Sequence, residues 1–98
     1  MPDTILVVED ELALREALVY SLKKDGYAVE AVSDGRSAVE TARKLKPNLI
    51  LLDLMLPGLD GFEVCRILRK EMTTAILMLT ARDDEIEEAM IPLLQARS

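Results

Sequence analysis

Short apolar runs alternate with segments of helical hydrophobic spacing along most of this chain. Thr4–Val8 is an apolar, β-branched run, which predicts a strand buried on both faces because such strands lose the polar alternation. Leucines at helical spacing then predict a helix over residues 11–24, which Gly26 ends. These leucines are Leu14, Leu18 and Leu22.

The same pattern repeats twice and ends in a fourth strand. Residues 27–32 predict a strand, and residues 33–35 a turn and helix cap before a helix over 36–45 that ends ahead of Pro47. The central strand, a third helix and a fourth strand follow over 48–53, 61–70 and 75–79. The expected inward positions are Ala38, Val39 and Ala42, then Phe62, Val64, Cys65 and Leu68. A further helical pattern begins at residue 83, but Pro92 interrupts it.

Alternating strands and helices with short connections predict an α/β domain. Right-handed crossovers favour an open parallel sheet with helices on both faces. In such sheets the functional crevice lies beyond the carboxyl ends of the strands, where the strand order reverses. Side chains at those ends are therefore the first candidates for chemistry.

Three carboxylates follow predicted strands: Glu9 and Asp10 after the first, and Asp53 at the end of the third. If these strands are neighbours, the charges converge and require a hard cation or a shared proton. Oxygen ligands without His or Cys favour Mg²⁺, beside which Asp53 could attack phosphorus as a nucleophile. The alternative is that Glu9 or Asp10 only caps the following helix. Thr80 brings a hydroxyl to the same edge, either for a phosphoryl oxygen or as a local cap.

Composition narrows the classes of partner. A chain of 98 residues fits one domain, and its net charge of −6 without a basic stripe argues against direct binding of nucleic acid. The single Cys65 forms no internal disulfide, and no apolar stretch approaches the length that spans a membrane. We expect a cytoplasmic protein without membrane contact.

Three segments, VVEDE, LILLDLMLPGLDG and ILMLTAR, resemble bacterial response-regulator receiver domains. The resemblance spans residues 4–88 and is strongest to receivers of the OmpR/PhoB subfamily, which precede a winged-helix DNA-binding domain. It implies a three-layer, CheY-like (flavodoxin-like) sheet of strand order 2-1-3-4. Any role in transcription would belong to a longer parent protein.

The resemblance also implies the site chemistry of a non-enzymatic phosphoacceptor. Asp53 would accept a phosphoryl group from a sensor histidine kinase, with Mg²⁺ held by Glu9, Asp10, Asp53 and the backbone carbonyl of Met55. Thr80 would be the switch hydroxyl. Pro57 and Gly61 match the loop after the acceptor, although ordinary turn chemistry explains both.

The sequence departs from the family after the fourth strand. Receivers have a fifth strand and helix, with a Lys that contacts the phosphoryl group and an aromatic switch residue, yet no lysine follows Lys70 and no aromatic residue follows Phe62. We therefore expect a single receiver domain over 1–98 that is incomplete at its C-terminus, with slow phosphorylation and self-association through the fourth strand. The alternative is a truncated or engineered interaction module without phosphate chemistry.

Two other classes fit less well. A haloacid-dehalogenase-like phosphatase also uses an Asp at a strand end, but it requires a second Asp two residues later, where this chain has Met55. A dinucleotide site requires glycines after the first strand, where this chain has Glu9, Asp10 and Glu11.

Overall fold

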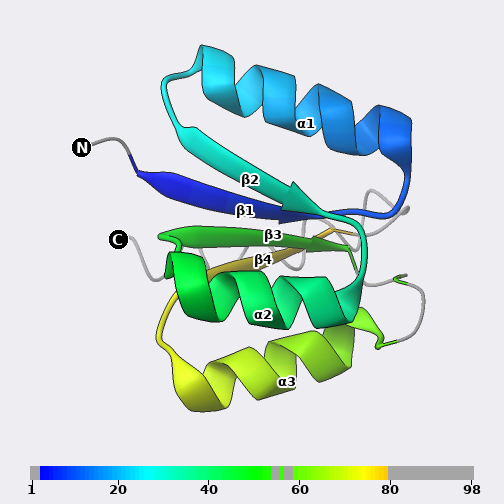
Figure 1. Cartoon of the computed structure of the whole chain (residues 1–98), viewed down its shortest axis with the longest axis vertical. Helices are drawn as coiled ribbons and strands as arrows, with labels where there is room; N and C mark the ends of the chain where they lie inside the picture. Colours follow the sequence, from blue (N-terminus) through cyan, green and yellow to red (C-terminus); the bar gives the residue numbers. More distant parts are fainter. Residues whose placement is uncertain (1–2, 54–55, 57–58, 80–98) are drawn as a thin grey trace.

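The structure is a computed structural model that describes residues 3–53, 56 and 59–79. Strands and helices alternate along these ranges (Figure 1), each beginning and ending within one residue of its predicted bounds. They are β1 Thr4–Val8, α1 Leu12–Lys24, β2 Ala28–Val32, α2 Gly35–Leu45, β3 Leu49–Asp53, α3 Gly61–Glu71 and β4 Ala75–Leu79. The helical pattern expected from residue 83 lies outside the described residues.

The four strands form one parallel sheet in the order β2-β1-β3-β4. Figure 1 shows three layers, with α1 on one face of the sheet and α2 and α3 on the other. The predicted α/β class and the strand order 2-1-3-4 are confirmed. Since β1 and β3 are adjacent and parallel, their carboxyl ends meet at the same edge of the sheet, where Val8 pairs with Leu52.

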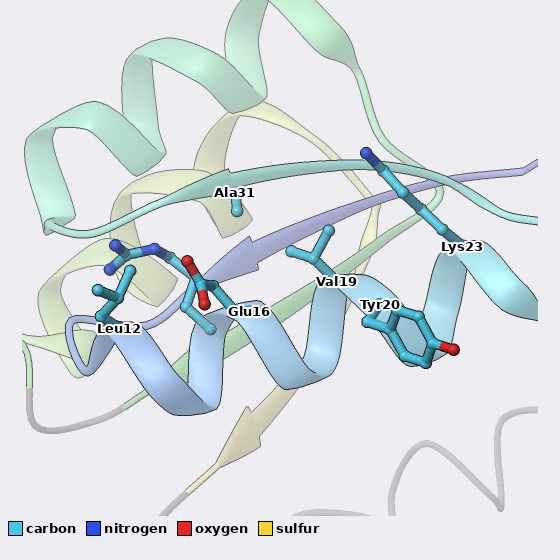
Figure 2. Close-up of a pocket in the computed structure, with 7 residues that line it drawn as sticks. Leu12, Glu16, Val19, Tyr20, Lys23 and Ala31 are labelled. Atoms are coloured by element: carbon cyan, nitrogen blue, oxygen red, sulfur yellow. The ribbon is translucent and has the colours of Figure 1, made fainter.

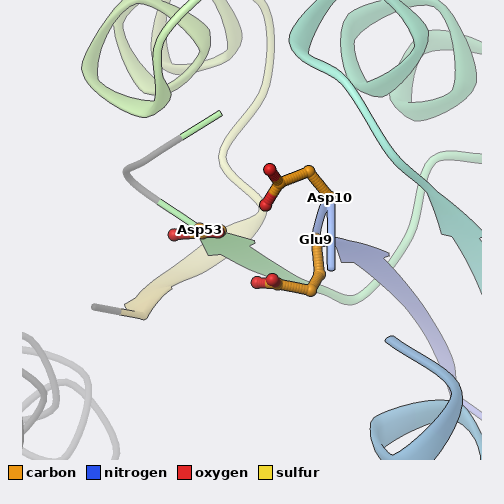
Figure 3. Close-up of side chains that lie close together, drawn as sticks. All are labelled: Glu9, Asp10 and Asp53. Atoms are coloured by element: carbon orange, nitrogen blue, oxygen red, sulfur yellow. The ribbon is translucent and has the colours of Figure 1, made fainter. Parts of the chain in front are cut away.

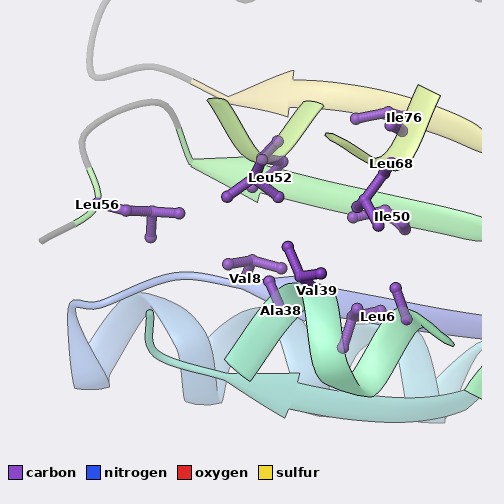
Figure 4. Close-up of a cluster of buried hydrophobic side chains, with 11 residues drawn as sticks. Leu6, Val8, Ala38, Val39, Ile50, Leu52, Leu56, Leu68 and Ile76 are labelled. Carbon is purple, nitrogen blue, oxygen red and sulfur yellow. The ribbon is translucent and has the colours of Figure 1, made fainter. Parts of the chain in front are cut away.

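The main core lies between the sheet and the helices α2 and α3 (Figure 4). Side chains of a strand alternate between faces, so alternate residues of β1, β3 and β4 point into this layer. The buried members are Leu6, Val8, Ala38, Val39, Ala42, Ile50, Leu52, Leu56, Val64, Leu68 and Ile76. The inward positions predicted for α2 are thus confirmed, as are Val64 and Leu68 of α3.

The opposite face carries a smaller core of Ile5, Val7 and Leu51, against which Leu18 and Leu22 of α1 pack. No residue of α1 is fully buried. Among the described residues, this face therefore relies on partly exposed side chains. Among these same residues, more fully buried apolar side chains lie on the α2 and α3 face.

One predicted inward position of α3, Phe62, is wrong, and another, Cys65, is only half-buried. Phe62 is 60% exposed, because successive residues turn by about 100° around a helix and Gly61, Val64 and Leu68 form the buried stripe. Cys65 borders that stripe and is half-buried. Leu14 is 43% exposed because it lies in the first turn of α1, at the sheet edge where β1 ends.

The helix ends match the predicted signals. Asp34 caps α2, since its carboxylate accepts a hydrogen bond of 2.8 Å from the Ser37 amide. Gly26 follows α1 with a φ of 99°, a left-handed conformation that glycine adopts without strain. Within the described ranges, no helix combines the length and apolar character needed to cross a membrane.

Candidate functional site

The carboxylates of Glu9, Asp10 and Asp53 converge at the carboxyl edge of the sheet. One oxygen from each lies within 4.8 Å of the others (Figure 3). The register explains the convergence, because Val8 pairs with Leu52 and the next residues of these strands, Glu9 and Asp53, are therefore neighbours. The predicted meeting of the three residues is confirmed.

Alternation along the strands also places Glu9 and Asp53 on the same side. Glu9 shares its face with Val7, and Asp53 shares its face with Leu51, both of which belong to the core under α1. Glu9 is 4% exposed and Asp53 is 9% exposed, whereas Asp10 is exposed. The cluster therefore has two buried carboxylates and one that reaches solvent.

Burial raises the pKa of Glu9 from 4.5 to about 7, helped by a hydrogen bond with Asp53 and by the charges of Asp53 and Asp10. The Glu11 amide acts in the opposite direction by donating to the Glu9 carboxylate. Two carboxyl groups that share a hydrogen bond must hold a proton between them, since two carboxylates repel. The cluster is thus a place where either a proton or a cation offsets negative charge.

The donor set suits a hard divalent cation. All three side chains offer oxygen, which Mg²⁺ prefers, and the exposed Asp10 leaves access for the waters that Mg²⁺ retains. The helix-cap alternative for Glu9 and Asp10 is wrong, because the N-cap residue of α1 is Glu11 and the helix has no side-chain cap bond. The Glu9 Oε1 instead accepts a hydrogen bond of 3.1 Å from the Glu11 amide, in the turn before α1. The Glu9 carboxylate therefore both bonds to the backbone of this turn and lines the cluster.

The other predicted site residues are only partly covered by the structure. Met55, Pro57 and Thr80 lie outside the described residues. Gly61 is the buried first residue of α3. The Asp60 carboxylate caps this helix by accepting a hydrogen bond of 3.0 Å from the Glu63 amide.

Sequence reasoning missed two tertiary contacts, one made to the site by Arg15 and one made to the loop after β3 by Gly35. Arg15 of α1 donates from Nη1 to the backbone carbonyl of Glu9 at 2.9 Å. Gly35 begins α2 so close to the loop after β3 that an added Cβ would overlap the Leu59 carbonyl oxygen. An Asp-Gly pair before a helix signals a cap, but the contact with Leu59 is tertiary and leaves no local signal.

A groove runs along α1 beside the edge strand β2 (Figure 2). Its volume is about 440 Å³. The lining includes exposed Leu12 together with Val19, Ala31, Arg15 and Lys23. Since Leu12 begins α1 just after the Glu9-Asp10 turn, the groove starts next to the carboxylate cluster and offers both apolar and charged contacts.

Comparison with known proteins identifies a family and several similar structures for this chain. The family model of the response regulator receiver domain matches residues 5–96 of this chain. This match extends beyond residue 88, where the resemblance seen in the sequence stopped. The BeF3-activated N-terminal receiver domain of Klebsiella pneumoniae RstA is 31% identical, with a TM-score of 0.79 over 97% of this chain and 94% of that one. Chemotaxis response regulator CheY4 of Vibrio cholerae is 26% identical, with a TM-score of 0.82 over 98% of both chains.

A putative response regulator from Chloroflexus aurantiacus is 33% identical, with a TM-score of 0.80 over 91% of this chain and 76% of that one. These likenesses agree with the α/β fold described above. The chain belongs to the response regulator receiver domain family of two-component signalling.

Proposed function

We propose that this chain is a single receiver domain over residues 1–98 that accepts a phosphoryl group on Asp53 with the help of Mg²⁺. The observation that carries the proposal is the convergence of Glu9, Asp10 and Asp53 within 4.8 Å at the carboxyl edge of a receiver fold. The chain then acts as a phosphoacceptor, and at most catalyses its own phosphorylation and dephosphorylation.

The reaction moves one phosphoryl group. A carboxylate oxygen of Asp53 attacks the phosphorus atom, so that an O–P bond forms while the bond between phosphorus and the donor nitrogen or oxygen breaks. The donor leaves with the electron pair of the broken bond, and the product is an aspartyl phosphate. Asp53 suits this role because it ends β3 at the carboxyl edge of the sheet, where open parallel sheets bind their ligands.

The three carboxylates suit the charge balance of this step. Bound Mg²⁺ would offset the negative charge of the carboxylates and of the incoming phosphoryl group. Glu9 and Asp10 would hold the cation together with Asp53, and the Met55 carbonyl would add a further oxygen ligand. Thr80 would donate its hydroxyl hydrogen bond to a phosphoryl oxygen, while Pro57 and Gly61 would shape the loop after the acceptor.

The family's lysine has no counterpart after Lys70 in these 98 residues. Loss of one preorganised positive group commonly lowers a rate by about 10²-fold or more. We therefore expect phosphorylation of this chain to be slow. The likeness of its motifs to the OmpR/PhoB subfamily further suggests regulation of transcription, through a longer parent protein.

The proposed donor is a sensor histidine kinase in the cytoplasm. The groove along α1 supports this partner, because it begins beside the cluster and exposes Leu12 and Tyr20, which are 57% and 69% exposed. Apolar anchors flanked by Arg15, Glu16 and Lys23 suit a helical protein surface. No nucleic acid or membrane is part of the proposal.

Incubation with acetyl phosphate and Mg²⁺, followed by intact-mass analysis, tests the function. We expect a slow mass increase of one phosphoryl group that hydroxylamine removes, and no increase for Asp53→Asn. Asp25→Asn is the matched control, since it removes an exposed carboxylate at the far end of α1. No adduct on the wild-type chain, or an equal adduct on Asp53→Asn, contradicts the proposal.

A second candidate function is an interaction module that self-associates through β4 without phosphate chemistry. Within the described part of the chain, β4 ends the sheet, and its Leu77 and Leu79 lie half-buried on the α1 face. Apolar side chains beside a strand edge favour pairing with a second copy. Light scattering should show dimers that Leu77→Lys disrupts, while a stable monomer at high concentration argues against this function.

A further inference from the structure

The turn between β1 and α1 holds two of the proposed Mg²⁺ ligands, Glu9 and Asp10. Glu11 occupies the N-cap position of α1 but makes no side-chain cap bond. The Glu9 carboxylate accepts from the Glu11 amide instead, at 3.1 Å. The position of the Glu9 side chain therefore depends on how firmly the backbone of this turn is held.

Arg15 holds that backbone from within α1. Its Nη1 donates to the Glu9 carbonyl oxygen at 2.9 Å and lies 3.4 Å from the Asp10 carbonyl oxygen. One guanidinium nitrogen thus reaches the carbonyls of two successive residues, both proposed as metal ligands. Arg15 is half-buried, and its bond to the Glu9 carbonyl is partly protected from competition with water, whereas its contact with the Asp10 carbonyl is exposed.

The guanidinium faces carbonyl oxygens, and Arg15 is not among the charges that shift the pKa of Glu9. We propose that Arg15 is a positioning residue for the Mg²⁺ site, which orients Glu9 and Asp10 through their backbone carbonyls. The inference rests on the proposed function for its metal, but the contacts stand without it.

Positioning and simple charge predict opposite effects on metal affinity. If Arg15 acted only through its positive charge, removing it would strengthen Mg²⁺ binding, because one repulsive charge near the cation would vanish. If Arg15 orients the ligands, removing it weakens binding. Outer partners that orient metal ligands typically contribute about 10- to 100-fold in affinity.

Arg15→Met tests the proposal, with Lys23→Met as its matched control. Methionine retains most of the length of the stem and removes the donors and the charge. Lys23 also lies on α1 and lines the same groove, but the carbonyl contacts belong to Arg15. Calorimetric titration with Mg²⁺ should show affinity at least about tenfold weaker for Arg15→Met and unchanged or slightly stronger for Lys23→Met.

Amide hydrogen exchange in the metal-free chain provides the second measurement. The Glu11 amide should exchange at least about tenfold faster in Arg15→Met, because its acceptor Glu9 loses its fixed position. The Ser37 amide is the internal reference, since the Asp34 carboxylate holds it in the same way at the start of α2. Its rate should stay constant in both variants, which excludes general destabilisation.

Two results would overturn the inference: Mg²⁺ affinity that is equal or higher in Arg15→Met, or a Glu11 exchange rate that does not change. Failure of the proposed function gives a different result, because the wild-type chain itself would then bind no Mg²⁺. In that case the Glu11 exchange rate alone decides whether Arg15 holds the turn.

Discussion

Glu9 at the end of β1 and Asp53 at the end of β3 share a hydrogen bond between two carboxyl groups. Burial and this neighbour raise the pKa of Glu9 to about 7. A cation that binds the carboxylate form of Glu9 therefore competes with a proton at and below neutral pH. This proton links the stability of the fold, the pH and the uptake of metal.

The first prediction concerns stability without metal. Because the pKa of Glu9 is about 7 in the folded chain and 4.5 in the reference state, the folded state binds more protons between these values. Glu9 therefore makes the fold less stable as pH rises from about 4.5 to about 7. Glu9→Gln removes the titration and keeps the shape of the side chain.

Thermal unfolding in the presence of a chelator, followed by circular dichroism, measures the effect. The Tm of Glu9→Gln should exceed that of the wild type by roughly 5 °C or more above pH 7, and the difference should shrink toward pH 4.5. Comparing two chains at each pH cancels the other carboxylates, including Asp34, whose pKa its hydrogen bonds from Ser37 lower. A difference that is constant with pH contradicts the assignment.

The second prediction concerns the uptake of Mg²⁺. Binding requires the carboxylate form of Glu9, so the affinity should rise roughly tenfold between pH 6 and pH 8 and level off above the pKa. Calorimetry in buffers of different ionisation enthalpy should show release of a proton on binding at pH 6. Glu9→Gln should bind Mg²⁺ weakly and without release of a proton. A wild-type Mg²⁺ affinity that does not change with pH would falsify the shared-proton description.

The strands and the site edge were predictable because their signals are local. Apolar runs bounded by acidic or turn residues fix the ends of β1 and β3, and the parallel arrangement follows from the alternation of elements. Glu9 and Asp53 are therefore placed at one edge by the pattern alone. Their hydrogen bond could not be predicted in this way, since it depends on the register between the strands.

Other features depend on contacts that no local pattern encodes. Phe62 is apolar and close to the helical spacing of α3, yet it lies outside the buried stripe. In the sequence, Arg15 looks like an ordinary surface residue of a helix. Its bonds to the Glu9 and Asp10 carbonyls form only in the folded chain, where the turn before α1 lies beside it. The exposed fraction of Leu14 likewise depends on where the sheet ends beneath α1.

The third prediction concerns the two faces of the sheet. Leu68 of α3 is fully buried in the main core, whereas Leu14 of α1 is 43% exposed. Leu68→Ala should lower the free energy of unfolding by about 3 kcal/mol, and Leu14→Ala by less than about 1 kcal/mol. Urea unfolding of both variants measures this, and equal losses would show that α1 is as deeply packed as α3.

The last prediction concerns the close approach of α2 to the loop after Asp53. A Cβ at Gly35 would overlap the Leu59 carbonyl oxygen and lie 2.9 Å from both the Leu59 Cβ and the Val64 Cγ2. Since backbone and a fully buried valine bound the space, Gly35→Ala has to move the loop. We expect a loss of about 1–3 kcal/mol together with changed NMR shifts at Leu59 and Asp53.

Gly26→Ala is the matched control for this substitution. Nothing lies within 4 Å of a Cβ at Gly26, but its φ of 99° makes alanine strained there, at a cost of about 1–2 kcal/mol. Its NMR changes should stay near the connection of α1 to β2, at the other edge of the sheet from Asp53. Gly26→Ala should leave the Leu59 and Asp53 resonances unchanged. If Gly35→Ala also left them unchanged, the contact with α2 would not determine the conformation of the loop.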